Sequence, residues 1–412
     1  MLMPLQDASL TDVPPTATSR NLVIQQLRGW AILLVLAQHI SLVTQLLGLL
    51  PGRVTNSGYL GVELFFVISG FVVTRSLQRG GWNLRHFVVR RLFRLYPALL
   101  FFLGICALVW GVTSFWAPGD LPRQLFGASD WRFVTQGAQV LTGTLTLNTS
   151  PRLYVHAAMW SLSVEFQFYA ALALLAFAVL RAGGDARQCE RGLWLLALGV
   201  VGYYALARLL MLLGFNQPGM AWLFQMRFDF LAAGTLLALV PPGWLYRAGF
   251  GRARLALLLA MVGTVLALSG FRHPWPEMPL QPHNWLELLG YPAALVGFSW
   301  AVAVAATMAD HGVGRSVVGR LMLWLGDRSY SLYLVHFPIL ALVWIGLWLT
   351  DLRLVAQPWT YGPVQAVLGI GLSALVADAC FRWVERPGID FGSRLLRWHA
   401  IRPAQTAPAG RG

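Results

Sequence analysis

The sequence predicts an all-α fold: a polytopic membrane helix bundle of about ten transmembrane helices, with both termini cytoplasmic. Hydrophobic residues make up 57% of the 412 residues and charged residues only 12%, whereas a soluble domain carries about a quarter charged residues. Apolar runs recur along the chain at lengths near the ~20 residues that a helix needs to cross a bilayer. Basic residues lie mainly in the connections between those runs. Composition, run length and charge placement therefore agree on one fold class.

Ten apolar segments are candidates for membrane spans, and only helices satisfy the backbone hydrogen bonds of so many short segments inside lipid. The longest connection, 113–156, contains prolines and aromatic residues, so we expect it to cap the bundle or enter the membrane interface. The sequence has no recognisable repeat and no separate soluble domain. In chain order, the ten segments cover residues 22–47, 58–78, 88–112, 157–180, 192–213, 222–240, 254–271, 286–308, 322–349 and 362–384.

Arginine placement predicts the orientation of these segments. All 31 basic residues are arginines. If the N-terminus is cytoplasmic and ten spans alternate in direction, 23 arginines fall in cytoplasmic segments and 6 in outer loops. The two others, Arg208 and Arg227, lie within spans. This asymmetry is typical of membrane topology, so the net charge of +14 does not indicate a nucleic-acid partner.

The chain is expected to divide into one membrane domain and two tails. Residues 1–21 are polar and lack a signal-peptide cleavage pattern, so we predict a disordered cytoplasmic N-terminal tail. Residues 22–386 form the transmembrane domain, and 387–412 form a cytoplasmic C-terminal tail. The three cysteines have no metal-ligand spacing, and we predict neither a disulfide framework nor a metal site.

The first segment carries two polar residues that should face the protein interior. Arg28 and His39 are 11 residues apart, which is about 20° from three full helical turns, so both lie on one helix face about 16 Å apart along the axis. A histidine this deep is costly in lipid. The pair fits a reactive site, and it also fits a snorkelling arginine with a packing histidine.

The second and fourth segments place carboxylates at a similar depth. Glu63 lies near the outer end of the second segment, and Ser69 follows on that segment beside a glycine that permits close helix approach. Glu165 lies in the outer half of the fourth segment, 157–180, and Trp160 lies near the start of that segment. By depth, these carboxylates and His39 could converge, and a carboxylate can orient a histidine and stabilise its cation. A structural His–Glu pair is the alternative.

An arginine cluster extends from the end of the second segment to the start of the third. Six arginines exceed what topology requires, and guanidinium groups suit bidentate phosphate binding. Coenzyme A carries a pyrophosphate and a 3′-phosphate, so it fits such a cluster. Contact with anionic lipid is the alternative. The six are Arg75, Arg79, Arg85, Arg90, Arg91 and Arg94.

The last two segments contain further polar residues. Tyr330 and His336 lie in the ninth segment, and His336 is followed by Pro338. His336 either lines a cavity or satisfies a carbonyl group that Pro338 frees. Glu385 lies at the cytoplasmic edge of the tenth segment, where we expect it to pair with an arginine as a structural latch.

These motifs, in this order, resemble the membrane-bound acyltransferase-3 family. Each motif alone is weak, but together they extend over nearly the whole chain. The matching motifs are Arg28-Gly29 to His39, Gly61 to Phe71, Arg90-Arg91 to Pro97, Trp160 to Tyr169, Ser329 to Pro338, and Glu385-Arg386-Pro387.

The resemblance implies an O-acyltransferase that moves an acyl group, often acetyl, from cytoplasmic acyl-CoA to a hydroxyl acceptor. It implies His39 as the catalytic residue and Arg28, Arg91 and Arg94 as donor-binding residues. We also predict Glu165 as a catalytic residue that orients His39 or stabilises its charge. The remaining candidates, expected to line the cavity, are Glu63, Ser69, Trp160, Tyr330 and His336.

The resemblance also implies the partners and the location. The acceptor would be a glycan, a lipid-linked sugar or a small molecule, and acyl-CoA would be a substrate rather than a permanently bound cofactor. The protein would lie in a bacterial inner membrane among its lipids, and an esterase-like periplasmic partner would be a separate protein. Two departures from the family pattern, Glu63 in place of aspartate and Gln38 before His39, leave the class of acceptor open.

A second function fits the same residues. Buried histidine and glutamate side chains can form a proton relay in a multi-pass transporter. The arginine cluster would then serve topology or lipid binding. The inverted repeat common in carriers is not recognisable in the sequence.

Overall fold

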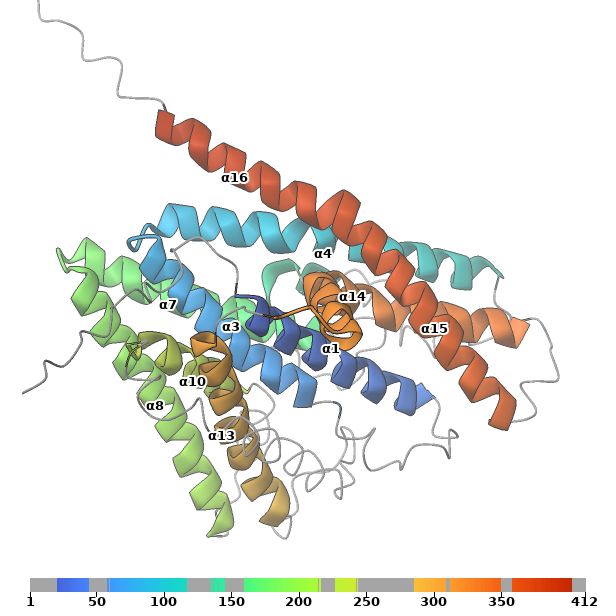
Figure 1. Ribbon diagram of the computed structural model, residues 1–412, viewed down its shortest axis with the longest axis horizontal. Coiled ribbons are helices and arrows are strands. Elements are labelled where there is room, and N and C mark those ends of the chain that lie inside the picture. Colours follow the sequence, from blue (N-terminus) through green and yellow to red (C-terminus); the bar gives the residue numbers. More distant parts are fainter. Residues whose placement is uncertain are drawn as a thin grey trace, which may run out of the picture.

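The computed structural model describes residues 21–43, 58, 60–116, 135, 137–139, 141–144, 159–213, 215, 227–241, 243, 285–308, 312–349 and 358–401. The long elements within these ranges are helices, and they form a bundle (Figure 1). In order they are α1 (Leu22–Val43), α3 (Leu60–Arg79), α4 (Leu84–Trp116), α7 (Trp160–Arg181), α8 (Ala186–Leu212), α10 (Phe228–Leu239), α13 (Trp285–Thr307), α14 (Val317–Leu349), α15 (Pro358–Cys380), the π-helix η4 (Phe381–Glu385) and α16 (Arg386–Ile401).

The helices follow the apolar segments of the sequence. Nine of the ten predicted segments contain a helix. The remaining one, the seventh segment at 254–271, lies outside the described residues. Among the described helices, six are long and apolar enough to cross a membrane. Large apolar side chains such as Leu174, Leu195 and Leu375 are exposed on the bundle surface, as expected for helices that face lipid. The fold is therefore all-helical, while the number of ten spans stays a prediction.

The segment 222–240 is the clearest departure from the expected spans. Its helix, α10, has only 12 residues, fewer than the ~20 that a helix needs to cross a bilayer. Arg227 precedes it in the left-handed region, with φ 53°, and this conformation does not continue a helix towards the N-terminus. Arg227 and Asp229 are both buried in this first turn. The start of α10 is therefore a polar junction inside the bundle.

Glycines bring the central helices into close contact. A Cβ atom on Gly70 of α3 would lie 2.0 Å from the carbonyl oxygen of Leu231 in α10, and one on Gly234 would lie 2.1 Å from that of Val67. A Cβ atom on Gly29 of α1 would likewise clash with the carbonyl oxygen of Met322 in α14. Any side chain at these positions would force the helix backbones apart. The sequence expectation of close approach beside Ser69 is confirmed.

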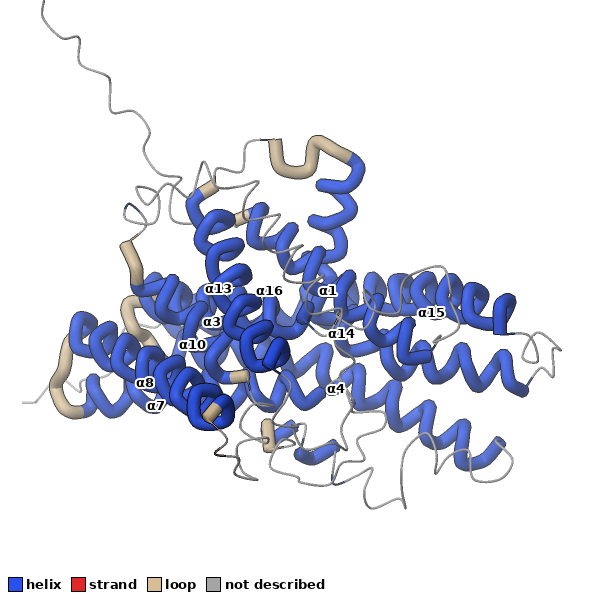
Figure 2. Tube along the Cα trace, turned by 90° about the horizontal axis from the view of Figure 1, so that it is seen from below, coloured by secondary structure: helices blue, strands red, loops and turns tan. Residues whose placement is uncertain are grey.

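The C-terminal part of the bundle is one long helical rod. Helices α15, η4 and α16 follow one another without interruption and extend across the molecule (Figure 1). Figure 2 shows α15 on the opposite side of the bundle from α7 and α8. The chain from residue 387, predicted as a tail, is helical up to Ile401. It lies against α4, where a Cβ atom on Gly388 would be only 2.7 Å from the Pro97 ring.

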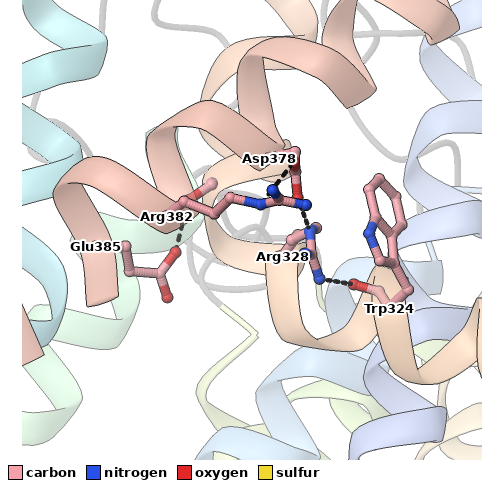
Figure 3. A network of polar contacts seen from close by, with 6 residues as sticks. Trp324, Arg328, Asp378, Arg382 and Glu385 are labelled. Atoms are coloured by element: carbon pink, nitrogen blue, oxygen red, sulfur yellow. Dashed lines mark hydrogen bonds and ion pairs between the residues drawn. The ribbon is translucent and has the colours of Figure 1, made fainter. Parts of the chain in front are cut away.

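An ionic cluster joins this rod to α14 (Figure 3). Arg328 Nε lies 2.5 Å from Asp378 Oδ1, and Arg382 Nε lies 2.9 Å from Asp378 Oδ2. Glu385 was expected to pair with an arginine, but its Oε2 accepts a hydrogen bond of 2.6 Å from Ser331 Oγ. The latch between the ninth and tenth segments therefore exists, with Asp378 as the acidic partner of the arginines.

Candidate active site

Six of the ten side chains that the sequence singles out meet on the wall of one cavity. It lies between α1, α3, α4, α7 and α14 and has a volume of about 90 Å³. A water molecule needs about 10–15 Å³ of such space, so the cavity suits a few waters or a slender chain. We call it the arginine cavity. The six side chains are Arg28, Ser69, Arg91, Arg94, Glu165 and Tyr330.

Three guanidinium groups give the cavity its positive charge. Arg91 and Arg94 project from one face of α4 because they are three residues apart, and Arg28 reaches the cavity from α1. Arg91 lies over the rings of Phe87 and Tyr169, at 6.0 and 5.3 Å from their centroids. Such cation–π contacts hold a guanidinium in place without neutralising it. The wall can therefore bind an anionic ligand.

Glu165 is the acidic side chain among the described residues that line the cavity. The hydroxyl groups of Ser69 and Tyr169 are hydrogen-bonded to each other, and the Glu165 carboxyl group lies within hydrogen-bonding reach of both. Arg91 and Arg28 act on it electrostatically. Tyr169 was missed as a site residue, although its position four residues after Glu165 places both on one face of α7.

His39 lies against His336 of α14 and not against a carboxylate. His336 Nε2 is 3.2 Å from His39 Nδ1, and the ring centroids are 4.8 Å apart. His39 Nδ1 also lies 2.9 Å from the carbonyl oxygen of Val35. The predicted same-face relation of Arg28 and His39 is visible here, because both meet side chains of α14.

When both rings are neutral, their hydrogen bonds assign the positions of the protons. His336 Nδ1 lies 2.8 Å from the Tyr333 carbonyl oxygen and 3.1 Å from that of Leu332. Carbonyl oxygens only accept hydrogen bonds, so His336 carries its proton on Nδ1 and Nε2 is an acceptor. His39 Nδ1 then donates to this nitrogen and to Val35. The lone pair of His39 is therefore on Nε2, the form in which an imidazole can act as a base or nucleophile.

Tyr333 separates the arginine cavity from the histidine pair. Its side chain lines the cavity, and its ring centroid is 5.8 Å from that of His336. The Tyr333 and Ser161 hydroxyl groups are 2.7 Å apart, and the ring also faces Phe65 at 6.4 Å. Sequence reasoning missed Tyr333, although it lies one helical turn before His336 and one turn after Tyr330. A ligand passing from the arginines to His39 meets this side chain.

Glu63, Glu165 and His39, which the sequence places at a similar depth, have different neighbours among the described residues. Glu63 Oε1 lies 3.3 Å from Nε of Arg227, whose guanidinium is 3.5 Å from the ring centroid of Tyr291. Glu165 instead belongs to the arginine cavity. Depth along the helices was similar, but each helix turns its carboxylate towards a different neighbour.

Trp160 and His336 do not line the arginine cavity. The Trp160 ring packs edge-on against Phe66, with centroids 6.0 Å apart, and Phe66 in turn lines the cavity. Trp160 therefore supports the wall from behind. Within the described ranges, no group of three His, Cys, Asp or Glu side chains is arranged to hold a metal ion, and Cys106, Cys189 and Cys380 are buried free thiols.

Sequence comparison identifies the class of protein to which this helical bundle belongs. The family model described as an acyltransferase domain matches residues 21–378, and the chain belongs to this acyltransferase-3 family. The multi-pass membrane character follows from this membership together with the six apolar helices.

Two relatives are similar over most of the chain. The peptidoglycan O-acetyltransferase OatA of Listeria monocytogenes is 25% identical over 90% of this chain and 56% of its own length. The O-acetyltransferase OatA of Staphylococcus aureus (strain NCTC 8325) is 24% identical over 88% of this chain and 56% of its own length. The chain thus spans about half the length of the curated relatives it matches. No solved structure matches it.

Proposed function

We propose that this chain is a membrane O-acyltransferase that moves an acyl group, most simply acetyl, from cytoplasmic acyl-CoA to a hydroxyl group of a surface or exported glycan. The observation that carries the proposal is the arginine cavity in a chain of the acyltransferase-3 family. The names of the two relatives support O-acetyl transfer, and one of them specifies peptidoglycan, which supports a glycan acceptor. A bacterial inner membrane is the location that fits this activity.

The arginine cavity would hold the donor. Arg91, Arg94 and Arg28 would bind the donor's phosphates, and the thioester arm would extend into the narrow part of the cavity towards Ser69 and Glu165. The aromatic contacts of Arg91 keep that group in place before the donor arrives, which lowers the entropic cost of binding.

His39 would carry out the chemistry beyond Tyr333. In one route, Nε2 takes the proton of the acceptor hydroxyl while the hydroxyl oxygen attacks the thioester carbonyl. The new C–O ester bond forms, the C–S bond breaks, and the coenzyme A thiolate takes up the proton. In the second route, Nε2 attacks the thioester carbonyl, the C–S bond breaks, and coenzyme A leaves as the thiolate. The acceptor hydroxyl oxygen then attacks the acyl-imidazole, the N–C bond breaks, and the hydroxyl proton passes through Nε2 to the thiolate. His336 would position His39 in both routes by holding its Nδ1–H.

The transporter hypothesis is not favoured. The family model describes an acyltransferase domain, and the two relatives are named O-acetyltransferases. The histidine pair is better explained as a reactive imidazole with a positioning partner.

The first test is the release of coenzyme A thiol from acetyl-CoA by purified protein in nanodiscs. His39→Ala should lower the rate by about 10²–10⁴-fold, the usual contribution of general base catalysis. The exposed double variant Arg181→Gln/Arg187→Gln is a control for changes outside the site, with size-exclusion profiles compared for all proteins. Full turnover by His39→Ala would contradict the role of His39. A folded wild type that releases thiol from none of several acyl-CoA donors would contradict the proposed donor.

Rapid quenching followed by mass spectrometry separates the two routes. An acyl group on the peptide that contains His39, formed and lost at the rate of turnover, would identify the acyl-histidine route. Turnover without such a species would identify direct transfer.

A further inference from the structure

A second pocket lies at the turn between α3 and α4. It has a volume of about 230 Å³ and is lined mostly by polar groups. We call it the turn pocket. Its lining residues come from the end of α3, the turn and the first two turns of α4: Ser76, Arg79, Gly80, Asn83, His86, Phe87 and Arg90.

The turn that forms this pocket has a fixed conformation. Gly81 and Trp82 both have positive φ angles, 59° and 61°. A positive φ is unusual for tryptophan and costs roughly 1–3 kcal/mol. The Trp82 side chain is buried in the hydrophobic core, which offsets that cost and anchors the turn. Asn83 Oδ1 accepts a 3.0 Å hydrogen bond from the backbone N–H of His86 and thereby caps α4. The two helix ends are therefore held at a defined spacing.

The charged and polar side chains that line the turn pocket suit an anion. Arg79 comes from α3 and Arg90 from α4, and among the described residues neither forms an ion pair. The described lining contains no carboxylate. Glu190, at the same end of the bundle, accepts a 2.9 Å hydrogen bond from Gln78. Two guanidinium groups on different helices, with an imidazole and an amide between them, match the acceptor oxygens of a phosphate group.

The turn pocket and the arginine cavity adjoin along the same two helices. On α3, Val72 lines the cavity and Ser76 lines the pocket, one helical turn or about 6 Å apart. On α4, Arg91 of the cavity lies over the ring of Phe87 of the pocket. One continuous face of the α3–α4 pair therefore leads from Arg79 and Arg90 at the end of the bundle to Ser69 and Glu165 inside it.

We propose that the turn pocket binds the 3′-phosphate of the acyl-CoA donor, with Arg79 and Arg90 as its ligands. This inference rests on the proposed function. The pyrophosphate would then lie near Arg91 and Arg94, and the thioester arm would follow α3 into the cavity. A donor with a branched anionic head and a long slender arm fits an exposed polar pocket that adjoins a narrow buried one.

The spacing along α3 supports this arrangement. Arg79 and Ser69 are ten residues apart, about 15 Å along the helix axis, so one extended ligand must reach both. An anionic lipid has a phosphate head as well, but its acyl chains belong on the outer surface of the bundle. The arginine cavity lies between five helices, and its volume of about 90 Å³ suits a single slender chain.

The test compares acetyl-CoA with 3′-dephospho-acetyl-CoA, which lacks only the phosphate in question. Wild-type protein in nanodiscs of zwitterionic lipid should show a KM about tenfold higher for the dephospho donor, with little change in kcat. Arg79→Gln/Arg90→Gln should raise the KM for acetyl-CoA about tenfold and leave the KM for the dephospho donor nearly unchanged, because its ligand group is already missing. Adenosine 3′,5′-bisphosphate should inhibit the wild type more strongly than this variant.

Arg181→Gln/Arg187→Gln removes the same charge from the exposed turn between α7 and α8. Because a hydrogen bond from Gln78 to Glu190 joins the end of α3 to the start of α8, this control separates loss of local charge from loss of the pocket. It should leave the preference for the 3′-phosphate intact.

Each outcome decides between the alternatives. Equal effects of the Arg79/Arg90 variant on both donors would overturn the phosphate assignment, and effects that require anionic lipid in the nanodisc would identify a lipid site instead. A wild type that uses both donors with the same KM would also overturn it, while leaving the acyltransferase intact. Failure of the wild type to use or bind either donor would overturn the proposed function itself.

Discussion

Two groups of charged residues inside the bundle differ in their balance of charge. Around the start of α10, Arg208 NH2 lies 2.7 Å from Asp229 Oδ2, and Arg227 Nε lies 3.3 Å from Glu63 Oε1. All four residues are buried, with at most 8% of their surface exposed. Two cations therefore face two anions. We call this group the α10 ion pairs.

The arginine cavity has the opposite balance. Three guanidinium groups and one carboxyl group line it, and Glu385, which acts electrostatically on Arg94 and Arg28, lies behind the wall. Burying a charge costs several kcal/mol unless a partner compensates, so an excess of cations favours the binding of an anion, as proposed for the donor. The α10 ion pairs satisfy their own charges and join α3, α8 and α10. The difference teaches that charge balance, more than burial, separates binding residues from structural ones.

The largest expected effect is the loss of stability on breaking one of the α10 ion pairs. Asp229→Ala leaves Arg208 buried without its anion and should destabilise the protein by about 3–5 kcal/mol. Thermal unfolding in detergent and the yield of monodisperse protein measure this loss. Replacing both partners, as Arg208→Met/Asp229→Leu, should recover most of the stability because no lone charge remains. A stable Asp229→Ala protein would show that the pair is not structural.

In the arginine cavity, a similar change should affect binding and not folding. Arg91→Gln/Arg94→Gln removes two charge-assisted contacts to the donor, each worth about 1.5–3 kcal/mol, and should raise the donor KM roughly 100-fold. The melting temperature should not fall, because two like charges on one face of α4 are removed. Equal changes in donor and acceptor KM would argue against donor binding at this wall.

A smaller effect is expected at His336, which belongs to neither group. His336→Phe keeps an aromatic ring of similar shape but removes the acceptor nitrogen that fixes His39 Nδ1–H. We expect kcat to fall about tenfold, which corresponds to about 1.4 kcal/mol, with the donor KM unchanged. Steady-state kinetics of thiol release measure both. A parallel loss of stability and of both kinetic constants would indicate a packing role alone.

The smallest effect is expected in the cluster of Figure 3, where one ion pair is exposed. The Arg382 side chain is 61% exposed, and exposed pairs contribute only about 0–1 kcal/mol. The free energy of unfolding of Arg382→Gln should therefore lie within about 1 kcal/mol of that of the wild type. Arg328→Gln is the matched comparison. Because Arg328 is largely buried, this substitution should lower the free energy of unfolding by more. Equal losses of unfolding free energy in the two variants would mean that exposure does not determine how much these ion pairs stabilise the protein.

Much of the fold could be predicted from sequence because the relevant signals are local. Apolar runs gave the positions of nine helices, and the 100° rotation per residue placed Arg28 and His39 on the face of α1 that meets α14. Helix periodicity also makes neighbours of Glu165 and Tyr169. The start of the helix in segment 222–240 could not be predicted in this way, because apolarity does not register the left-handed residue at Arg227, after which α10 begins at Phe228.

The partners of the polar side chains could not be predicted in the same way. Glu63 had the right depth to meet His39, yet α3 turns it towards Arg227. Glu385 was expected beside an arginine and lies on Ser331. Depth follows from position along one helix, whereas a partner depends on how two helices are rotated about their axes.

The sequence by itself determined that this chain is a helical membrane protein whose arginines gather at one side of the predicted spans. Its motifs indicated the acyltransferase family. The tertiary structure decided which of the charged residues balance one another and which remain as an excess around a cavity. The physical reason is that helix rotation is fixed by packing, as where Gly70 and Gly234 bring α3 against α10. That contact between distant segments sets where Glu63 points, and no local pattern in the sequence encodes it.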